Sequence, residues 1–498
     1  MMQPEMRDRI EAHWLRRSLL LHSAVVFLLL LPIGLGFAGS DYLRGVALTS
    51  LLYFFLRSVA NVKWSVTTYL LLFFLLPDTW AFDFGSFLPL ITLRRMFLLI
   101  LLLSFVLNYR RFISRERFPK AFRFAIGLLI FSYTMSTILS VDFRTSLFRL
   151  FHLIVEQIIF MFIIYKVLHG RELAKNGLMA LCIAALILCI FANVEYISKV
   201  NYFTQVSLSE SSLRTYWATY ENVQRFSIYG RIHSLCTHPM TFGGFLAIVF
   251  PIVIAFVLLS KNPLNRIGFF VIAFLCTEGV FFSLARSPVM ALLAGIAVIL
   301  IFMIREGRIK MSVSILFIGI VLLFGIFSLY EPARTLLLYS VKPWEQPVNM
   351  GGSSLASRIR QFKAATAYFS QRPVFGYGPG AGWIERTGAF SKELVGGLEN
   401  FWIRNLLEIG WFGILSLVLF LGQVILLFYR SYKFSKGEPE NILSISGIAS
   451  LTAFLVFATA TGEMGAFHLV FILLPLVIRS VWQSEFFVHQ ARIMRNRR

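Results

Sequence analysis

Three arginines and one glutamate stand close to long apolar stretches of the chain. Arg231 lies in GRIHSLCTHP, Arg286 in FFSLARSPV, Arg358 in SRIRQF and Glu399 in GGLENFW. The planar guanidinium fork of arginine binds phosphate oxygens through two hydrogen bonds and stays charged. A carboxylate beside such a fork can take the proton from an attacking hydroxyl group. We therefore predict group transfer from a diphosphate-linked donor, with Glu399, Arg286 and Arg231 as the catalytic residues.

Each of these residues also has an ordinary structural explanation. Arg358 would contact lipid headgroups if its segment lies in the membrane interface, and Arg286 would reach the interface from the end of an apolar run. Arg231 would cap a loop, and Glu399 would pair with one of the arginines. The functional interpretation depends on whether the fold brings the four side chains together.

Four side chains are predicted to bind substrate: Arg358, Arg360, His238 and Asn400. His238 has the strongest structural alternative, because Thr237 as a helix cap and Pro239 in the first turn would explain that stretch locally. The sequence contains no Asp-rich metal motif, no phosphate-binding Gly-rich loop and no His/Cys ligand spacing. We therefore expect neither a metal nor a cofactor.

The composition excludes a water-soluble fold. Of 498 residues, 57% are hydrophobic and 14% are charged, whereas soluble domains carry about a quarter charged residues. A soluble fold of this size could not bury so much apolar surface, but a lipid bilayer acts as its solvent. The first apolar run, from Leu19 to Phe37, lacks a small-residue cleavage site and is interpreted as a retained helix rather than a signal peptide.

The chain is strongly basic, with a net charge of +22. The basic residues are dispersed between apolar runs, which is typical of cytoplasmic loops and argues against a nucleic-acid partner. Three of the four cysteines lie within apolar runs and only Cys236 lies near a loop, so no disulfide framework is expected.

The sequence predicts an all-α fold, a polytopic transmembrane helix bundle of about 12–14 spans with a large outer-face loop that contains short interfacial helices. The second apolar run is short and the fourth carries Arg94 and Arg95, so the number of spans stays open between these limits. The candidate runs are 18–38, 43–57, 64–82, 89–107, 121–140, 147–168, 176–197, 241–260, 265–284, 288–304, 311–330, 400–429, 444–460 and 464–482.

Lys and Arg gather in both terminal tails and in alternate links, such as 108–123, which predicts that both termini are cytoplasmic. The candidate residues then fall on the outer face. LASRIRQFKAATAYFS (355–370) is predicted to form an interfacial helix. The predicted organisation is N-terminal transmembrane spans at 1–197, an outer loop at 198–240, further spans at 241–330, a large outer loop at 331–399, and C-terminal spans with a basic cytoplasmic tail at 400–498.

Four stretches carry a family resemblance in their order and spacing. They are GRIHSLCTHPMTFGGFLAIVFPI (230–252), FFSLARSPVMALLAG (281–295), SRIRQFKAATAYFSQRPVFGYGPGAGW (357–383) and ENFWIRNLLEIGWFGIL (399–415). Together the sequence resembles the O-antigen ligase and O-antigen or exopolysaccharide polymerase superfamily of bacterial membrane proteins over roughly 225–480. The N-terminal spans agree only in hydropathy.

The resemblance implies a metal-independent glycosyltransferase of the bacterial plasma (inner) membrane, whose active site is on the outer face. Its donor would be a glycan on a polyprenyl (undecaprenyl) diphosphate, bound by Arg231 and Arg286. Glu399 stands where the ligases often have His, whereas some polymerase-like members have Glu there, as this chain does. Ala285 stands where the family usually has Ser.

Three functions remain open. The first is an envelope polysaccharide polymerase for an O-antigen, exopolysaccharide or capsule-type polymer. The second is a ligase that moves finished glycan to another acceptor. The third is a lipid-linked sugar transporter or flippase, which the absence of an evident internal repeat disfavours. The expected partners are the lipid-linked donor, a glycan or lipid acceptor, the lipid bilayer and other polysaccharide-assembly proteins.

Overall fold

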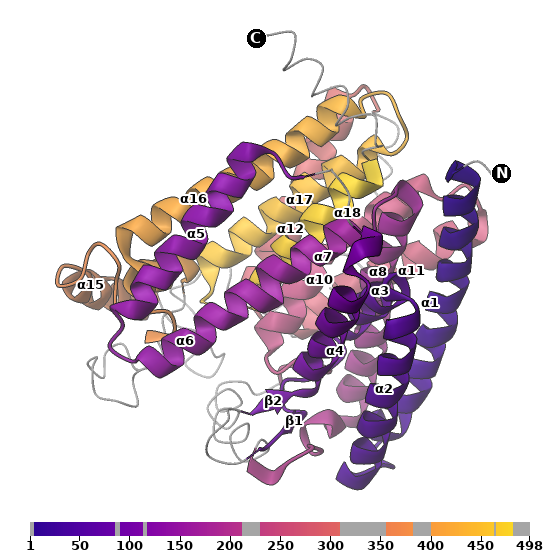
Figure 1. Ribbon diagram of the computed structural model, residues 1–498, viewed down its shortest axis with the longest axis horizontal. Coiled ribbons are helices and arrows are strands. Elements are labelled where there is room, and N and C mark those ends of the chain that lie inside the picture. Colours follow the sequence, from indigo (N-terminus) through magenta and orange to yellow (C-terminus); the bar gives the residue numbers. More distant parts are fainter. Residues whose placement is uncertain are drawn as a thin grey trace.

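The protein is described by a computed structural model that covers residues 4–84, 90–112, 117–211, 230–308, 355–381, 400–462 and 465–481. For residues 4–9 and 355–361 only the backbone is described. Within these ranges, ten helices are long and apolar enough to cross a membrane. The predicted all-α polytopic bundle is confirmed (Figure 1).

Links of a few residues join many of the consecutive helices, whereas α6, η2 and α7 form one continuous span, Phe143–Val167. They are α1 (Pro4–Gly34), α2 (Ser40–Ala60), α3 (Val62–Leu72), α4 (Leu93–Leu107), α5 (Lys120–Ile138), α6 (Phe143–Phe151), the π-helix η2 (His152–Ile159), α7 (Phe160–Val167), α8 (Arg171–Ser198), α10 (Pro239–Leu259), α11 (Pro263–Phe282), α12 (Arg286–Arg305), α15 (Leu355–Phe369), α16 (Phe401–Phe434), α17 (Asn441–Ala460) and α18 (Phe467–Val481). Two 3-10 turns, η1 (Tyr109–Phe112) and η3 (Tyr202–Thr204), lie in links between helices.

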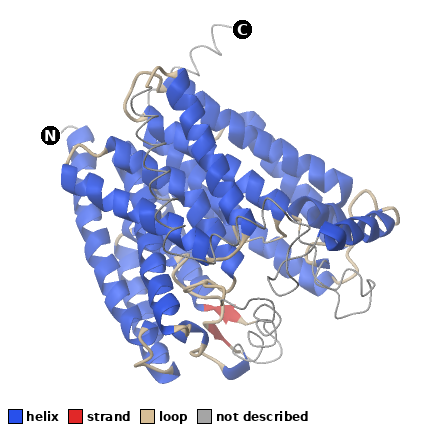
Figure 2. Cartoon of the chain, turned by 180° about the vertical axis from the view of Figure 1, so that it is seen from behind, coloured by secondary structure: helices blue, strands red, loops and turns tan. Residues whose placement is uncertain are grey.

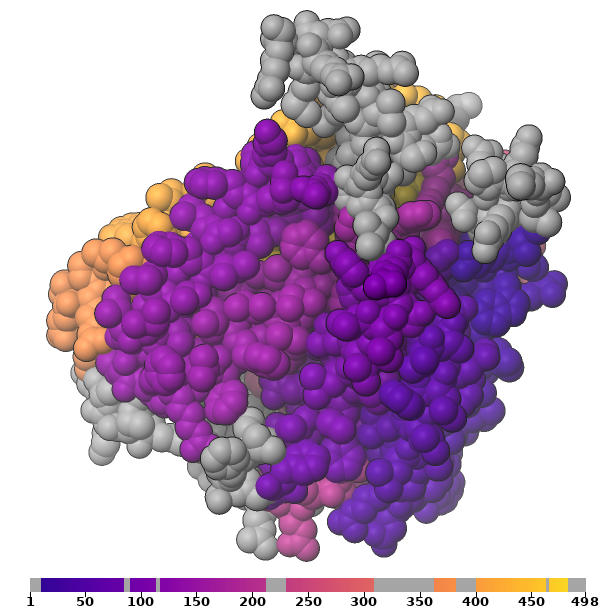
Figure 3. Space-filling view, in the orientation of Figure 1, coloured from indigo at the N-terminus to yellow at the C-terminus, as the bar shows by residue number. Residues whose placement is uncertain are grey.

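Helix α10 lies at the centre of the bundle, where it packs against α8, α11, α12 and α17. In the most hydrophobic 18-residue stretch of α10, 83% of the residues are buried, whereas only 28% are buried in the corresponding stretch of α1. The peripheral helices α1 and α2 turn large side chains such as Leu21, Leu28 and Leu52 outward, as expected of lipid-facing surfaces. Figure 3 shows one face of the molecule with these N-terminal helices at its edge.

The link between α3 and α4 contains a small antiparallel hairpin of β1 (Ala81–Phe82) and β2 (Ile91–Thr92), in which Ala81 pairs with Thr92. These are the only strands among the described residues (Figure 2). The Thr92 hydroxyl accepts a hydrogen bond from the Arg95 backbone N–H and caps α4. The hairpin thus fixes where α4 begins, and with it the position of two arginines in the first turn.

The helix boundaries differ from the predicted spans in three places. The second run forms a full helix of 21 residues, whereas α3 and α4 have only 11 and 15 residues. Arg286 does not end a span but is the first residue of α12, because Leu284 takes a left-handed conformation (φ 45°) after α11. The predicted span 311–330 lies outside the described residues.

Helix α16 is broken at Gly410, where φ is +66°. A segment of the large loop docks at the break and exchanges hydrogen bonds with it. The N–H groups of Trp411 and Phe412 donate to the carbonyl groups of residues 373 and 374, and the carbonyl groups of residues 407 and 408 accept from the N–H groups of residues 377 and 378. A membrane helix can be interrupted only where such partners satisfy its backbone.

Two glycines allow the backbones to approach this closely. A Cβ atom on Gly410 would lie 2.3 Å from the Val374 carbonyl oxygen, and one on Gly376 would lie 2.4 Å from the Leu407 carbonyl oxygen. Both residues also have positive φ angles, which L side chains rarely adopt. The docked segment and the first turns of α16 therefore form one structural unit.

Candidate functional site

The fold brings the segments of the two predicted diphosphate-binding arginines together. Arg231 Nε donates to the Ser283 carbonyl oxygen at 3.3 Å, and the Ile232 N–H donates to the Phe282 carbonyl oxygen at 3.2 Å. The loop that carries Arg231 therefore lies on the turn between α11 and α12. Arg286 starts α12 three residues after Ser283. Both guanidinium groups are half-buried at the same end of the bundle.

A half-buried carboxyl group near the end of α8 holds this loop in place. Glu195 accepts hydrogen bonds from the Ser234 N–H at 2.7 Å and from Asn201 Nδ2 at 2.9 Å. Asn201 also donates to the Ser234 carbonyl oxygen, and Ser234 itself has a left-handed backbone (φ 55°). The sequence analysis missed Glu195, although a carboxylate inside an apolar helix is a recognisable signal.

His238 is the N-cap of α10, a role that the sequence analysis assigned to Thr237. Its Nδ1 accepts a hydrogen bond from the Met240 N–H at 3.1 Å, and Pro239 occupies the first turn. Burial, and to a lesser extent the charge of Arg231, lowers the pKa of His238 to about 3. The imidazole therefore stays neutral near pH 7 and can accept the capping hydrogen bond.

The capping role predicts that asparagine can replace His238. We expect His238→Asn to fold like the wild type, since Asn is a good N-cap, and His238→Ala to lose about 1 kcal/mol of stability. The folded chain also binds fewer protons than the unfolded chain between the pKa of about 3 and the ordinary value of 6.5, so this residue makes stability rise with pH in that window. Thermal unfolding in detergent at pH 5 and pH 7 measures both effects, and His238→Asn should reduce the difference. Loss of glycan product in a well-folded His238→Asn protein would instead indicate substrate binding.

Asn400 caps α16 and ties it to α17. Its side chain accepts from the N–H groups of Trp402 and Ile403, and its Nδ2 donates to the Thr459 carbonyl oxygen at 2.7 Å. Asn400 therefore fixes the start of the helix that follows Glu399. Glu399 itself lies outside the described residues.

Arg358 and Arg360 lie in the first two turns of α15, whose backbone alone is described there. Further along α15, Ala365 forms a small buried cluster with Leu407 of α16 and with Tyr377 and Ala381 of the loop between the two helices. Helix α15 is thus joined to the start of α16, the helix that Asn400 caps. Whether the two arginines contact substrate stays a prediction.

A buried ion pair inside α16 was missed by the sequence analysis. Arg404 Nε donates to Glu408 Oε1 at 2.9 Å, and another nitrogen of Arg404 donates to the Gly462 carbonyl oxygen at 3.1 Å. Both side chains are less than 10% exposed. The pair lies one turn from Asn400 and stiffens the helix start on which the predicted base depends.

A second polar cluster joins α4, η2 and α18, and it contains a potential metal-ligand set among the described residues. The ligand atoms of His152, Glu156 and His468 lie within 4.8 Å of one another. However, Arg95 Nε already donates to Glu156 Oε1 at 2.7 Å. A divalent cation there would lie beside a guanidinium group at a strong electrostatic cost, so we assign the cluster as a hydrogen-bonded ion network.

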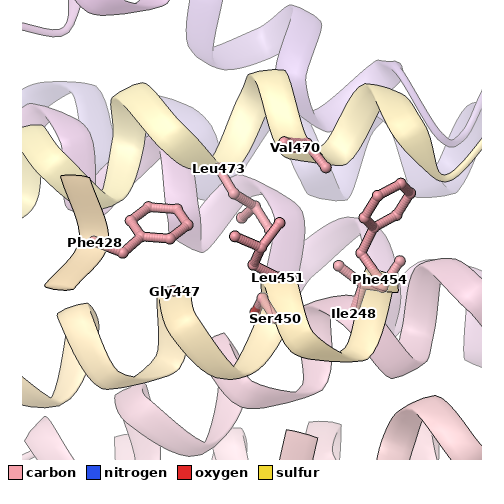
Figure 4. A pocket seen from close by; sticks show the side chains of 8 residues that line it. All are labelled: Ile248, Phe428, Gly447, Ser450, Leu451, Phe454, Val470 and Leu473. Atoms are coloured by element: carbon pink, nitrogen blue, oxygen red, sulfur yellow. The ribbon is translucent and has the colours of Figure 1, made fainter. Parts of the chain in front are cut away.

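A small apolar gap between α10, α16, α17 and α18 offers no chemistry. Its volume is about 10 Å³, about the minimum for a single water molecule. Figure 4 shows that Ile248, Phe428 and Phe454 are among the side chains that line it, and Ser450 supplies its only side-chain oxygen. The gap is therefore a packing defect within the bundle rather than a substrate site.

The described residues define a polytopic α-helical membrane protein with a cluster of polar and charged side chains near one end of the bundle. Residues 271–418 match the family model described as O-antigen ligase. The match supports the resemblance to the O-antigen ligase and polymerase superfamily over this part of the chain. The matched range includes Arg286, Arg358 and Glu399, whereas Arg231 precedes it. Comparison with curated proteins gave no match.

Proposed function

We propose that this membrane glycan enzyme is an envelope polysaccharide polymerase, which joins repeat units carried on polyprenyl diphosphate at the outer face of the bacterial plasma membrane. The observation that supports this most directly is the hydrogen bond from Arg231 to the turn that precedes Arg286. Two guanidinium groups that start from the same turn can bind a diphosphate through several charge-assisted hydrogen bonds.

The proposed reaction is a single displacement at the anomeric carbon of the donor. Glu399 takes the proton of the acceptor hydroxyl as its oxygen forms the new glycosidic bond. The bond between the anomeric carbon and the diphosphate oxygen breaks, and its electron pair leaves with the carrier diphosphate. Arg231 and Arg286 stabilise that developing charge. Arg358 holds the donor or gates the site.

The alternative function is a ligase that transfers finished glycan to a different acceptor. The two functions are separated by the glycan that accumulates when the gene is deleted in its host. A polymerase leaves single repeat units on the lipid carrier without long polymer. A ligase leaves long polymer that is still attached to the carrier. The size profile of lipid-linked and surface glycan in the deletion strain therefore decides between them.

The outer position of the large loop is tested by cysteine labelling. All four native cysteines are free and buried, so they give a low background with an impermeant thiol reagent. We expect a cysteine introduced within 345–352, such as Asn349→Cys, to label in intact cells. The matched control is Lys436→Cys in the link between α16 and α17, which should label only after lysis. Protection of residue 349 in intact cells, with labelling after lysis, would overturn the proposed topology.

A further inference from the structure

The ion network that joins α4, η2 and α18 has no role in the proposed donor site. Arg95 Nε and His152 Nδ1 both bond to Glu156 Oε1, at 2.7 and 2.9 Å. In the same turn of α4, Arg94 pairs with Asp78 at 2.8 Å, and its Nε is buried without a hydrogen-bond partner. Charged side chains inside a membrane helix bundle are costly and mark functional sites.

The backbone at this network is also unusual. His152 and Glu156 lie on η2, an eight-residue π-helix within an otherwise α-helical span. The next residue, Gln157, lies 3.5 Å from the Nε2 atom of His468 on α18. Because π-helices are rare and occur frequently at functional sites, the helix geometry supports a role beyond packing independently of the charges.

Only part of the network is open to a ligand. The side chains of Arg95 and His152 are 37% and 18% exposed, whereas that of Glu156 is 3% exposed. The buried carboxylate of Glu156 orients the accessible side chains of Arg95 and His152 through these two bonds. In a neutral imidazole that donates from Nδ1 to Glu156, Nε2 is a hydrogen-bond acceptor. The accessible part of the ion network therefore combines the guanidinium donors of Arg95 with the imidazole acceptor of His152.

This combination matches the hydroxyl groups of a sugar, since each hydroxyl group both donates and accepts a hydrogen bond. The location also fits. Phe467, which precedes His468, packs against Phe401 with ring centroids 5.5 Å apart, beside the start of α16. Arg94 lies over the ring of Phe73, and the neighbouring Phe74 packs against Phe245 of α10, the helix that His238 caps. Helix α4 and the α6–η2–α7 span both lie on the face shown in Figures 1 and 3.

We propose that Arg95 and His152, aligned by Glu156, form the subsite that binds the acceptor sugar next to the donor diphosphate. The inference rests on the proposed transferase function and adds the binding site of its second substrate. Arg95 donates to hydroxyl oxygens of the acceptor and His152 Nε2 accepts from a neighbouring hydroxyl group. Glu156 is a positioning residue.

The test separates acceptor binding from donor binding with the purified full-length protein in detergent. The donor is the host's own undecaprenyl-diphosphate-linked repeat unit. The acceptor is the same repeat unit as a decyl glycoside, which lacks a diphosphate and cannot act as a donor. The variants Arg95→Lys and His152→Gln keep a polar side chain at each position but remove the guanidinium fork and the imidazole acceptor. His22→Gln is the matched control, because His22 is an intramembrane histidine that hydrogen-bonds Tyr53 of α2 rather than a member of the ion network.

We expect each variant to raise the KM for the decyl glycoside about tenfold, as for the loss of one good hydrogen bond, while the KM for the donor changes less than twofold. The control should change neither. An unchanged acceptor KM, or an equal rise in both values, would overturn the acceptor subsite alone. Failure of the wild-type protein to extend the decyl glycoside would instead overturn the proposed polymerase function, and the subsite with it.

Discussion

Replacing Arg286 with alanine is expected to abolish long polymer and to leave single repeat units on the lipid carrier. The residue starts α12, next to the turn on which Arg231 docks. A group that stabilises charge developing on the leaving diphosphate contributes about 10²–10³ in rate when it is removed. The measurement is the size profile of surface glycan and of lipid-linked intermediates at equal protein level.

Lysine at the same position separates charge from geometry. Arg286→Lys keeps the positive charge but cannot form the two-pronged hydrogen bond to phosphate, so we expect partial activity between wild type and Arg286→Ala. The matched control is Arg44→Ala near the start of α2, where the arginine is exposed and pairs only with the exposed Asp41. Wild-type polymer in the Arg286→Ala strain would exclude a role in binding the diphosphate.

Replacing Glu399 with glutamine should also remove polymer, through a different step. Glutamine preserves the size and polarity of the side chain but cannot accept the proton of the attacking hydroxyl. General-base catalysis contributes about 10²–10⁴ in rate, so turnover should fall while donor binding is retained. Turnover and donor KM with the purified protein measure the two quantities separately.

Histidine offers a positive test of the same role, because either side chain can act as a base. We expect Glu399→His to recover part of the activity that Glu399→Gln loses, with a dependence on pH that follows imidazole. The structural control is Arg44→Ala, at the exposed arginine near the start of α2. Equal activity of the glutamine variant and the wild type would remove Glu399 from the mechanism.

The architecture was largely predictable because hydropathy reports directly on the membrane environment. The apolar runs located the spans correctly. The predicted boundaries were wrong where local backbone geometry, rather than hydropathy, decides where a helix begins or ends. Leu284 ends α11 with a left-handed residue, so Arg286 belongs to the next helix. The hairpin at residues 81–92 shortens α4 at its start. Neither feature has a hydropathy signal.

The site was predictable only in part. Family-like motifs identified Arg231 and Arg286, whose segments the fold brings together. The residues that support the site lie far from these motifs in the sequence. Glu195 of α8 binds the loop that carries Arg231, and Arg404 pairs with Glu408 inside α16. Such partners depend on tertiary packing. A charged residue in an apolar run indicates that a partner exists, but the sequence does not name it.

The broken helix constrains how this enzyme could be recombined with its relatives. Residues 373–378 complete the hydrogen bonding of α16 around Gly410, so the loop supplies backbone partners that no other segment of the described chain provides there. A chimera whose junction lies between this loop and α16 would join two halves of one interface from different parents. A transplant that keeps residues 372–412 together preserves that interface.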